Sequence, residues 1–147
     1  MKMKTAHVLF ILFFLISSCT KLEDQDSSGT SSNEYPDQES WNAKMYFTRD
    51  GKRQAVLSAG YIAKYSSQHY TLLREAVRVD FYDSEGKVKS VLTSREGKVM
   101  DETQDMIATG NVELVSNNGT HLYADELFWD NKPAKIRSRV PVKITTK

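Results

Sequence analysis

The chain has few of the residues that build most catalytic and metal centres. Its 147 residues include one cysteine, Cys19, and three histidines, His7, His69 and His121. A disulfide needs two cysteines, and a zinc site needs several cysteine or histidine ligands at regular spacing. The histidines show no such spacing. The sequence therefore predicts no disulfide, no metal site and no cofactor.

A surplus of charge of one sign is also lacking. The chain has 20 Lys and Arg residues against 19 Asp and Glu residues. Nucleic-acid-binding domains usually carry a clear basic surplus, often gathered in patches. We therefore expect no nucleic-acid partner.

No apolar run is long enough to span a membrane. The longest, from Val8 to Ile16, has nine residues, whereas a spanning helix needs about 20. Basic residues precede this run, and Ser17 and Ser18 follow it, which is the pattern of a cleavable secretory signal peptide. Residues 16–19, Ile-Ser-Ser-Cys, resemble the lipobox of bacterial lipoproteins, in which the cysteine is acylated. We predict a lipoprotein signal peptide over residues 1–18 and lipid attachment at Cys19. An ordinary signal peptide with an unmodified Cys19 is the alternative.

The next segment, residues 19–39, is predicted to be a flexible tether. It is rich in Ser, Asp and Glu and has almost no large apolar side chains. Such a composition buries too little apolar surface to order itself. As a random coil, it would hold a domain roughly 25 Å from the membrane.

Residues 40–147 are predicted to form one all-β domain. Apolar and polar residues alternate over 77–81, 112–114 and 140–144, which is the period of half-buried strands. Turn-forming residues lie between such segments at 49–51, 83–86 and 117–119. No segment has the period of an amphipathic helix.

A repeated pattern subdivides this domain. Leu57-Ser58-Ala59, Leu92-Thr93-Ser94 and Leu122-Tyr123-Ala124 recur at intervals of 35 and 30 residues. A polar turn follows each triplet, at residues 66–69, 101–104 and 130–133, and then comes a single apolar residue, Leu72, Ile107 or Ile136. The pattern indicates three strand–turn–strand units stacked along one axis. Chance similarity among β-hairpins is the alternative.

Acidic clusters offer only weak support for catalysis. Asp101, Glu102 and Asp105 could be drawn as a general acid–base pair, but the composition strongly favours an ordinary solvated turn. Residues 83–86 lack the regular oxygen spacing of a calcium loop. The domain is therefore expected not to be an enzyme, and an exported hydrolase remains a rival without an identifiable residue set.

Residues 107–144 resemble the LptC family, the periplasmic component of the lipopolysaccharide export machinery. The likeness rests on Gly110-Asn111-Val112, Leu122–Leu127, Ile136-Arg137-Ser138 and Pro141-Val142, in that order. Upstream, residues 57–86 resemble the first units of the same family, so the likeness covers residues 43–145. It implies an elongated, twisted β-jellyroll of two antiparallel sheets, open along one seam, with an apolar interior.

The resemblance also implies a function and partners. The domain would accept lipopolysaccharide from the inner-membrane ABC transporter, shield its lipid A acyl chains and pass it to a soluble periplasmic jellyroll bridge protein. Many family members have a spanning amino-terminal helix, which Cys19 replaces here. The expected location is the periplasmic face of the inner membrane, although Thr20 after the cysteine fits outer-membrane sorting. The predicted edge strand for the bridge partner is residues 140–145, with Val140, Val142 and Ile144.

The groove prediction is a set of apolar side chains taken from the expected strands: Val77, Val79, Phe81, Leu92, Ile107, Val112, Leu114, Leu127, Trp129, Ile136 and Val142. Because side chains alternate between the faces of a strand, a slip of one residue would turn a strand's set outward. The alternative function is a lipoprotein domain with a closed core that docks protein partners and binds no lipid.

Overall fold

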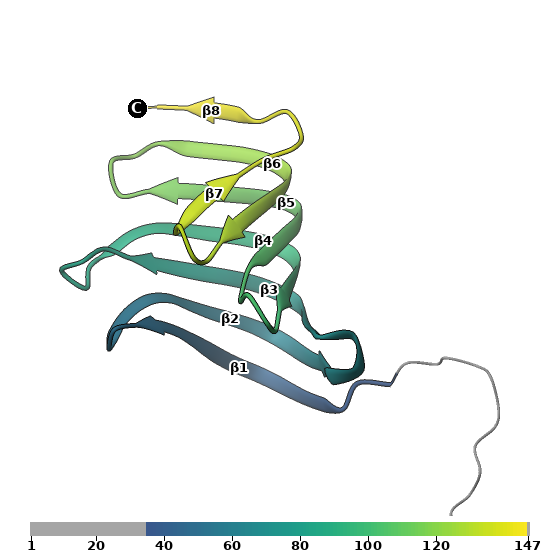
Figure 1. Ribbon diagram of the computed structural model, residues 1–147. Coiled ribbons are helices and arrows are strands. Elements are labelled where there is room, and N and C mark those ends of the chain that lie inside the picture. The colour runs from purple at the N-terminus through teal and green to yellow at the C-terminus, as the bar shows by residue number, and fades with distance from the viewer. Residues whose placement is uncertain (1–34, 147) are drawn as a thin grey trace, which may run out of the picture. The chain divides into compact units, whose positions relative to one another are not determined.

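The computed structural model describes residues 35–146. This part of the chain is almost entirely β (Figure 1). The strands are β1 (Gln38–Arg49), β2 (Lys52–Tyr65), β3 (Tyr70–Tyr82), β4 (Val88–Met100), β5 (Met106–Ser116), β6 (His121–Asp130), β7 (Lys135–Arg137) and β8 (Lys143–Thr145). The predicted all-β class is confirmed. Within residues 35–146, no helix has the length and apolar character needed to cross a membrane.

The strands form one antiparallel sheet in chain order. Each strand from β1 to β7 pairs with the next, and β8 pairs with β6. Figure 1 shows them stacked from β1 to β8, with the long strands curving round at one side. The two predicted sheets are therefore the two halves of one bent sheet, and the jellyroll-like arrangement is confirmed.

The bend follows a line of unusual backbone conformations in alternate strands. Positive φ angles occur at Asn42 in β1, at Glu75 and Ala76 in β3, and at Gly110 and Asn111 in β5. The pairing register shifts at this level of β3 and β5, where each strand holds one residue more than its neighbours. Such bulges bend a strand and increase its twist. We call this level of the sheet the bend line.

The bulges keep one face of the bent sheet continuous. In β2, the last inward side chain before the bend line is Ala59 and the first one after it is Ile62, three residues later. In β3, the corresponding inward side chains are Val77 and Leu73, which are four residues apart because the extra residue of the bulge lies between them. Ile62 and Leu73 are nevertheless direct partners, so the inner surface passes across the bend unbroken.

The sequence repeats occupy equivalent places in alternate strands. Leu57 in β2 pairs with Val79, which pairs with Leu92 in β4. Leu92 then pairs with Leu114, which pairs with Leu122 in β6. The three repeated leucines thus lie in one row across the sheet, and the stacking of strand–turn–strand units is confirmed.

The turns also form where the sequence places them. Asp83 Oδ1 accepts hydrogen bonds from the backbone N–H groups of Glu85 and Lys87, both at 2.9 Å, and so shapes the β3–β4 turn. In the β5–β6 turn, Asn118 Oδ1 accepts the N–H of Thr120 at 3.0 Å. These side chains therefore have structural roles, as expected of Asp and Asn in turns.

Two predicted boundaries differ from the structure. The first strand begins at Gln38, two residues before the expected domain start at residue 40. The predicted strand over residues 140–145 is wrong in its first half, because only Lys143–Thr145 form β8 and Val140 and Val142 lie outside it. Pro141 has no N–H to donate to a ladder, and Ser138 Oγ accepts the N–H of Val140 at 3.2 Å in a local turn. The predicted signal peptide and Cys19 lie outside the described residues.

The apolar trough and its seam

The candidate site is the inner face of the bent sheet, here called the trough. Most of the predicted groove residues lie in it. Seven are buried: Val77, Val79, Phe81, Leu92, Val112, Leu127 and Trp129. Leu114 and Ile136 are partly buried and pack against this cluster.

Two predicted groove residues lie elsewhere. Ile107 is wrong in orientation, because its neighbours Met106 and Ala108 are buried in the core cluster and a strand alternates its side chains. Val142 is 40% exposed and outside any strand. It borders a shallow hollow of about 610 Å³ with Val112 and Ala124, at the β6–β8 end of the trough.

Sequence reasoning missed the contribution of β1 and much of β2. Phe47, Leu57, Ile62 and Leu73 all belong to the same buried cluster. Leu57 carried a signal, since it heads the first repeated triplet, and Leu73 lies beside the apolar residue that follows the first turn. Phe47 also carried a local signal, because Ala43, Met45 and Phe47 alternate with Lys44, Tyr46 and Thr48 in the period of a half-buried strand.

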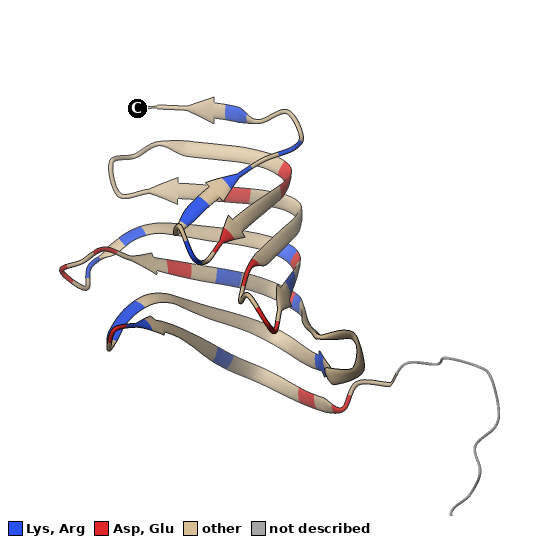
Figure 2. Ribbon diagram, viewed as in Figure 1, with Lys and Arg blue, Asp and Glu red and all other residues tan. Residues whose placement is uncertain are grey.

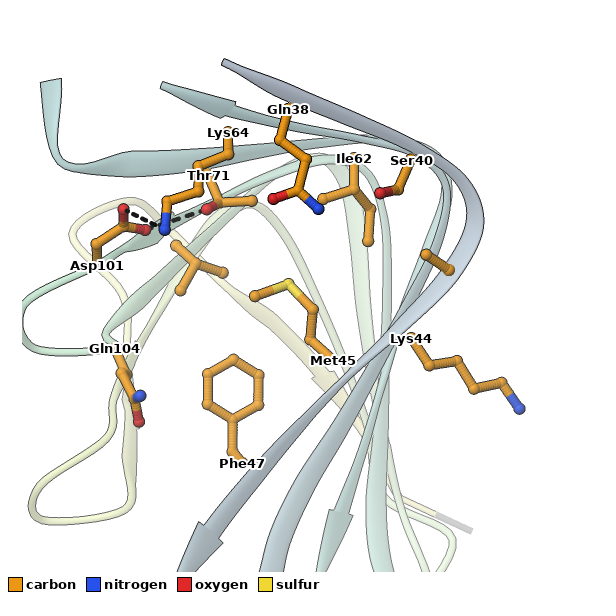
Figure 3. Close-up of a pocket in the computed structure, with 12 residues that line it drawn as sticks. Gln38, Ser40, Lys44, Met45, Phe47, Ile62, Lys64, Thr71, Asp101 and Gln104 are labelled. Carbon is orange, nitrogen blue, oxygen red and sulfur yellow. Dashed lines mark hydrogen bonds and ion pairs between the residues drawn. The ribbon is translucent and has the colours of Figure 1, made fainter. Parts of the chain in front are cut away.

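One cavity opens at the β1 end of the trough, with a volume of about 390 Å³ (Figure 3). Its apolar lining is Ala43, Met45, Phe47, Ile62 and Val99. Its rim is polar: Lys64 Nζ lies 3.7 Å from Asp101 Oδ2, and Thr71 Oγ1 donates to Asp101 Oδ1 at 3.1 Å. In Figure 3, Lys44 points away from the cavity. We call this the first cavity.

We call the side of the bent sheet where the end of β1 meets the β6–β7 turn the seam. A second cavity of about 270 Å³ opens farther along this seam. Phe81, Leu114, Trp129 and Ile136 supply its apolar lining, and Gln54, Lys89, Ser90 and Ser116 are among its polar neighbours. Four predicted groove residues therefore meet around this second cavity.

An aromatic trio lies between the cavities. The ring of Phe47, from the first cavity, meets Trp129, from the second, edge to face with centroids 5.3 Å apart. Phe81 meets the same indole at 5.3 Å. Two residues after Phe47, Arg49 reaches the β6–β7 turn across the seam: its Nη1 donates to the carbonyl of Lys132 at 3.0 Å, and its Nη2 to that of Asn131 at 2.6 Å. The lengthwise opening expected from the sequence is thus divided into two cavities.

The charged residues serve mainly to support the turns and the outer face. Figure 2 shows both signs distributed over the strands and turns. Asp105 Oδ1 accepts the N–H of Asn131 at 2.8 Å, and so connects the β4–β5 and β6–β7 turns. The acidic cluster of the β4–β5 turn thus holds turns in place. Within residues 35–146, no group of three Asp, Glu, His or Cys side chains is arranged to hold a metal ion.

Two carboxylates have shifted acidities. A hydrogen bond with His121, at 2.9 Å, lowers the pKa of Glu113 on the outer face of β5. The backbone N–H of Ser66 donates to Asp37 at 2.5 Å and lowers the pKa of that carboxyl. Both groups lie outside the two cavities, so neither points to proton transfer in the trough.

Comparison with known proteins matches this chain to one family. A family model described as LptC, lipopolysaccharide-assembly, LptC-related, matches residues 9–147. Among curated proteins, none matches the chain significantly. Proteins of this family are periplasmic components of the inner-membrane lipopolysaccharide export machinery, and the family is not a known enzyme family.

Proposed function

The chain belongs to the LptC-related family of lipopolysaccharide-assembly proteins, and we propose that its trough carries the acyl chains of lipopolysaccharide across the periplasm. One observation supports this step most directly. The apolar inner face runs from β1 to β6 without interruption by the bend, and cavities open from it at the seam. A lipid could therefore remain against apolar surface along the whole stack.

The energetic need for such a surface is large. Each methylene removed from water is worth about 0.8 kcal/mol, so several long chains exposed together would cost tens of kcal/mol. The cavity volumes, 390 and 270 Å³, are near the lower end of the range for ligand pockets, roughly 300–1,000 Å³. Each cavity is large enough for part of an acyl chain. The polar rim of the first cavity, at Lys64 and Asp101, would lie where the acyl chain joins the polar headgroup.

The ends of the stack are the proposed protein contacts. Within the described residues, β1 pairs only with β2, so its outer edge offers twelve residues of backbone to an added strand. At the other end, β8 offers the three residues Lys143–Thr145, with Ile144 57% exposed. Strand addition uses such free edges. We assign the β1 end to the ABC transporter and the β8 end to the soluble bridge protein.

The anchor and location are part of the same proposal. Acylated Cys19 would hold the domain at the periplasmic face of the inner membrane, with residues 20–37 as the connecting segment. Replacing Cys19 by Ala should release the protein from washed membranes when the transporter is absent. Retention of the variant under these conditions would contradict lipid anchoring.

A docking domain with a closed core is the second candidate. The close packing of the trough's centre favours it, because Leu57, Val79 and Leu92 have 0–1% exposure. Such a domain would bind the same protein edges but would hold no lipid.

Photocrosslinking separates the two candidates. A photoreactive residue at Val112 or Phe81, both inward, should capture lipopolysaccharide in energised membranes. Glu113, next to Val112, and Arg78, three residues before Phe81 in β3, lie on the opposite face and provide the controls. Capture from the inward positions alone supports transport. Absence of capture from all four, with partner crosslinks retained at the edges, would support the docking domain.

A further inference from the structure

Arg49 makes a contact that the strand pairing does not require. It ends β1, yet both of its Nη atoms donate to backbone carbonyls of the β6–β7 turn, more than eighty residues away in the sequence. The pairing of β1 with β2 shifts register between Phe47 and Thr48, just before this residue. The end of β1 is therefore offset from the regular ladder as it reaches across the seam.

The acceptor side of this contact is held firmly. Asn131 receives support from the β4–β5 turn, through its N–H to Asp105 at 2.8 Å and its side-chain amide to the carbonyl of Thr103 at 3.3 Å. The donor side is held less firmly, because β1 has only β2 as a strand neighbour in the described part of the chain. If the seam opens, β1 is the element that moves.

We propose that Arg49 is a latch that closes the seam and that its release joins the two cavities into one continuous trough. This rests on the proposed lipid transport. In the closed state, the Phe47–Trp129 contact separates the cavities. When Arg49 leaves the Asn131 and Lys132 carbonyls, β1 carries Phe47 away from Trp129. Acyl chains then extend from the first cavity into the second.

The chemistry suits reversible closure. Hydrogen bonds from a charged guanidinium to neutral carbonyls are directional and stronger than neutral pairs. No carboxylate accepts these two bonds, so water can replace the acceptors when the seam opens. Loss of both bonds should raise the open population about tenfold, since each charge-assisted bond contributes a modest net amount at a partly exposed site.

Distance measurement between spin labels tests the latch. The full chain, with Cys19→Ser, carries labels at Thr48→Cys and Lys132→Cys, two exposed positions on opposite sides of the seam. Without lipid, a single short distance is expected. Purified lipopolysaccharide should add a longer distance, and Arg49→Met should show that longer distance without lipid. Arg53→Met is the control, because Arg53 lies over the rings of Tyr46 and Tyr82 instead of crossing the seam.

Two results would overturn the latch. One is an Arg49→Met distance distribution equal to that of the parent without lipid. The other is bound lipopolysaccharide, detected by capture at Phe81 in the second cavity, with the short distance unchanged. Failure to bind any lipid would refute the proposed transport. The spin-label distances of Arg49→Met and the parent, both measured without lipid, would still decide whether Arg49 closes the seam.

A locked protein gives an independent measurement. The unlabelled double variant, Thr48→Cys with Lys132→Cys, can be closed by joining its two introduced thiols with a short reducible crosslinker. The crosslink should abolish lipid capture at Phe81, which lines the second cavity, and reduction should restore it. Equal capture by the locked and reduced forms would contradict the need for opening.

Discussion

The centre of the trough and its β1 end should respond differently to truncation. Leu92 is 1% exposed, lies in the row between Val79 and Leu114, and does not line the first or the second cavity. Met45 is partly buried and lines the first cavity, so one side of its side chain lacks packing partners. Leu92→Ala and Met45→Ala therefore test where the interior is filled.

The two magnitudes follow from packing. Truncating a buried leucine costs about 2–5 kcal/mol, as lost transfer energy plus an unfilled cavity. Leu92→Ala should lower the free energy of unfolding by about 3 kcal/mol, which corresponds to roughly 12 °C in Tm for a domain of this size. Met45→Ala enlarges a space that already exists and should cost about 1 kcal/mol, or roughly 4 °C.

Urea and thermal unfolding, followed by circular dichroism, measure both variants in the full chain with Cys19→Ser. The dependence of the unfolding free energy on urea should be unchanged, showing that the unfolding transition exposes the same surface. Equal costs for the two variants would refute a trough that is packed at its centre and open at the β1 end. A Met45→Ala cost near 3 kcal/mol would show that the first cavity is filled.

Three further changes test the bend, the strand orientation and the acid sensitivity. Gly60→Ala should cost about 1–3 kcal/mol of unfolding free energy, because the added Cβ would lie 2.7 Å from Glu75 Cβ at the bend line. Gly97→Ala should cost less unfolding free energy, because its added Cβ would lie 3.0 Å from a Leu73 methyl group that can move. A larger loss for Gly97→Ala than for Gly60→Ala in urea unfolding would contradict the tight approach at the bend. Met106→Thr should destabilise by more than about 2 kcal/mol and Ile107→Thr by less than about 1 kcal/mol, and equal losses would mean that Ile107 also faces the trough. The hydrogen bond with His121 lowers the pKa of Glu113, so this group stabilises the fold above its unfolded pKa, and the contribution is lost as the pH falls through its lower folded pKa. The stability difference between the parent and Glu113→Gln, measured by urea unfolding, should therefore shrink from about pH 5 to about pH 3, and a constant difference would rule out this linkage.

Local sequence patterns predicted much of the fold. Alternation over residues 77–81 identified the inward side chains of β3, and the repeated leucines identified equivalent positions in β2, β4 and β6. Asp83 and Asn118 marked turns because their side chains satisfy nearby backbone N–H groups. Each of these signals depends on neighbours in the sequence.

Features that depend on distant partners could not be found in this way. Ile107 was assigned inward as an isolated apolar residue after a turn, but its orientation is fixed by pairing along β5. The contact of Phe47 with Trp129 and the reach of Arg49 across the seam exist only once the sheet has bent. The sequence therefore predicted that Phe81 and Trp129 point inward, but it could not predict which distant side chains would meet between the cavities.

The spacing of the bend line also bears on how such a domain can change in length. The positive-φ residues Asn42, Ala76 and Asn111 recur 34 and 35 residues apart, once in every second strand. Duplicating or deleting one hairpin would keep every bulge aligned with the next and would lengthen or shorten the lipid path by a whole unit. Adding a single strand would place an unbulged strand where a bulge is needed and would break the inner surface. A domain with this bend line should therefore lengthen or shorten in hairpin steps.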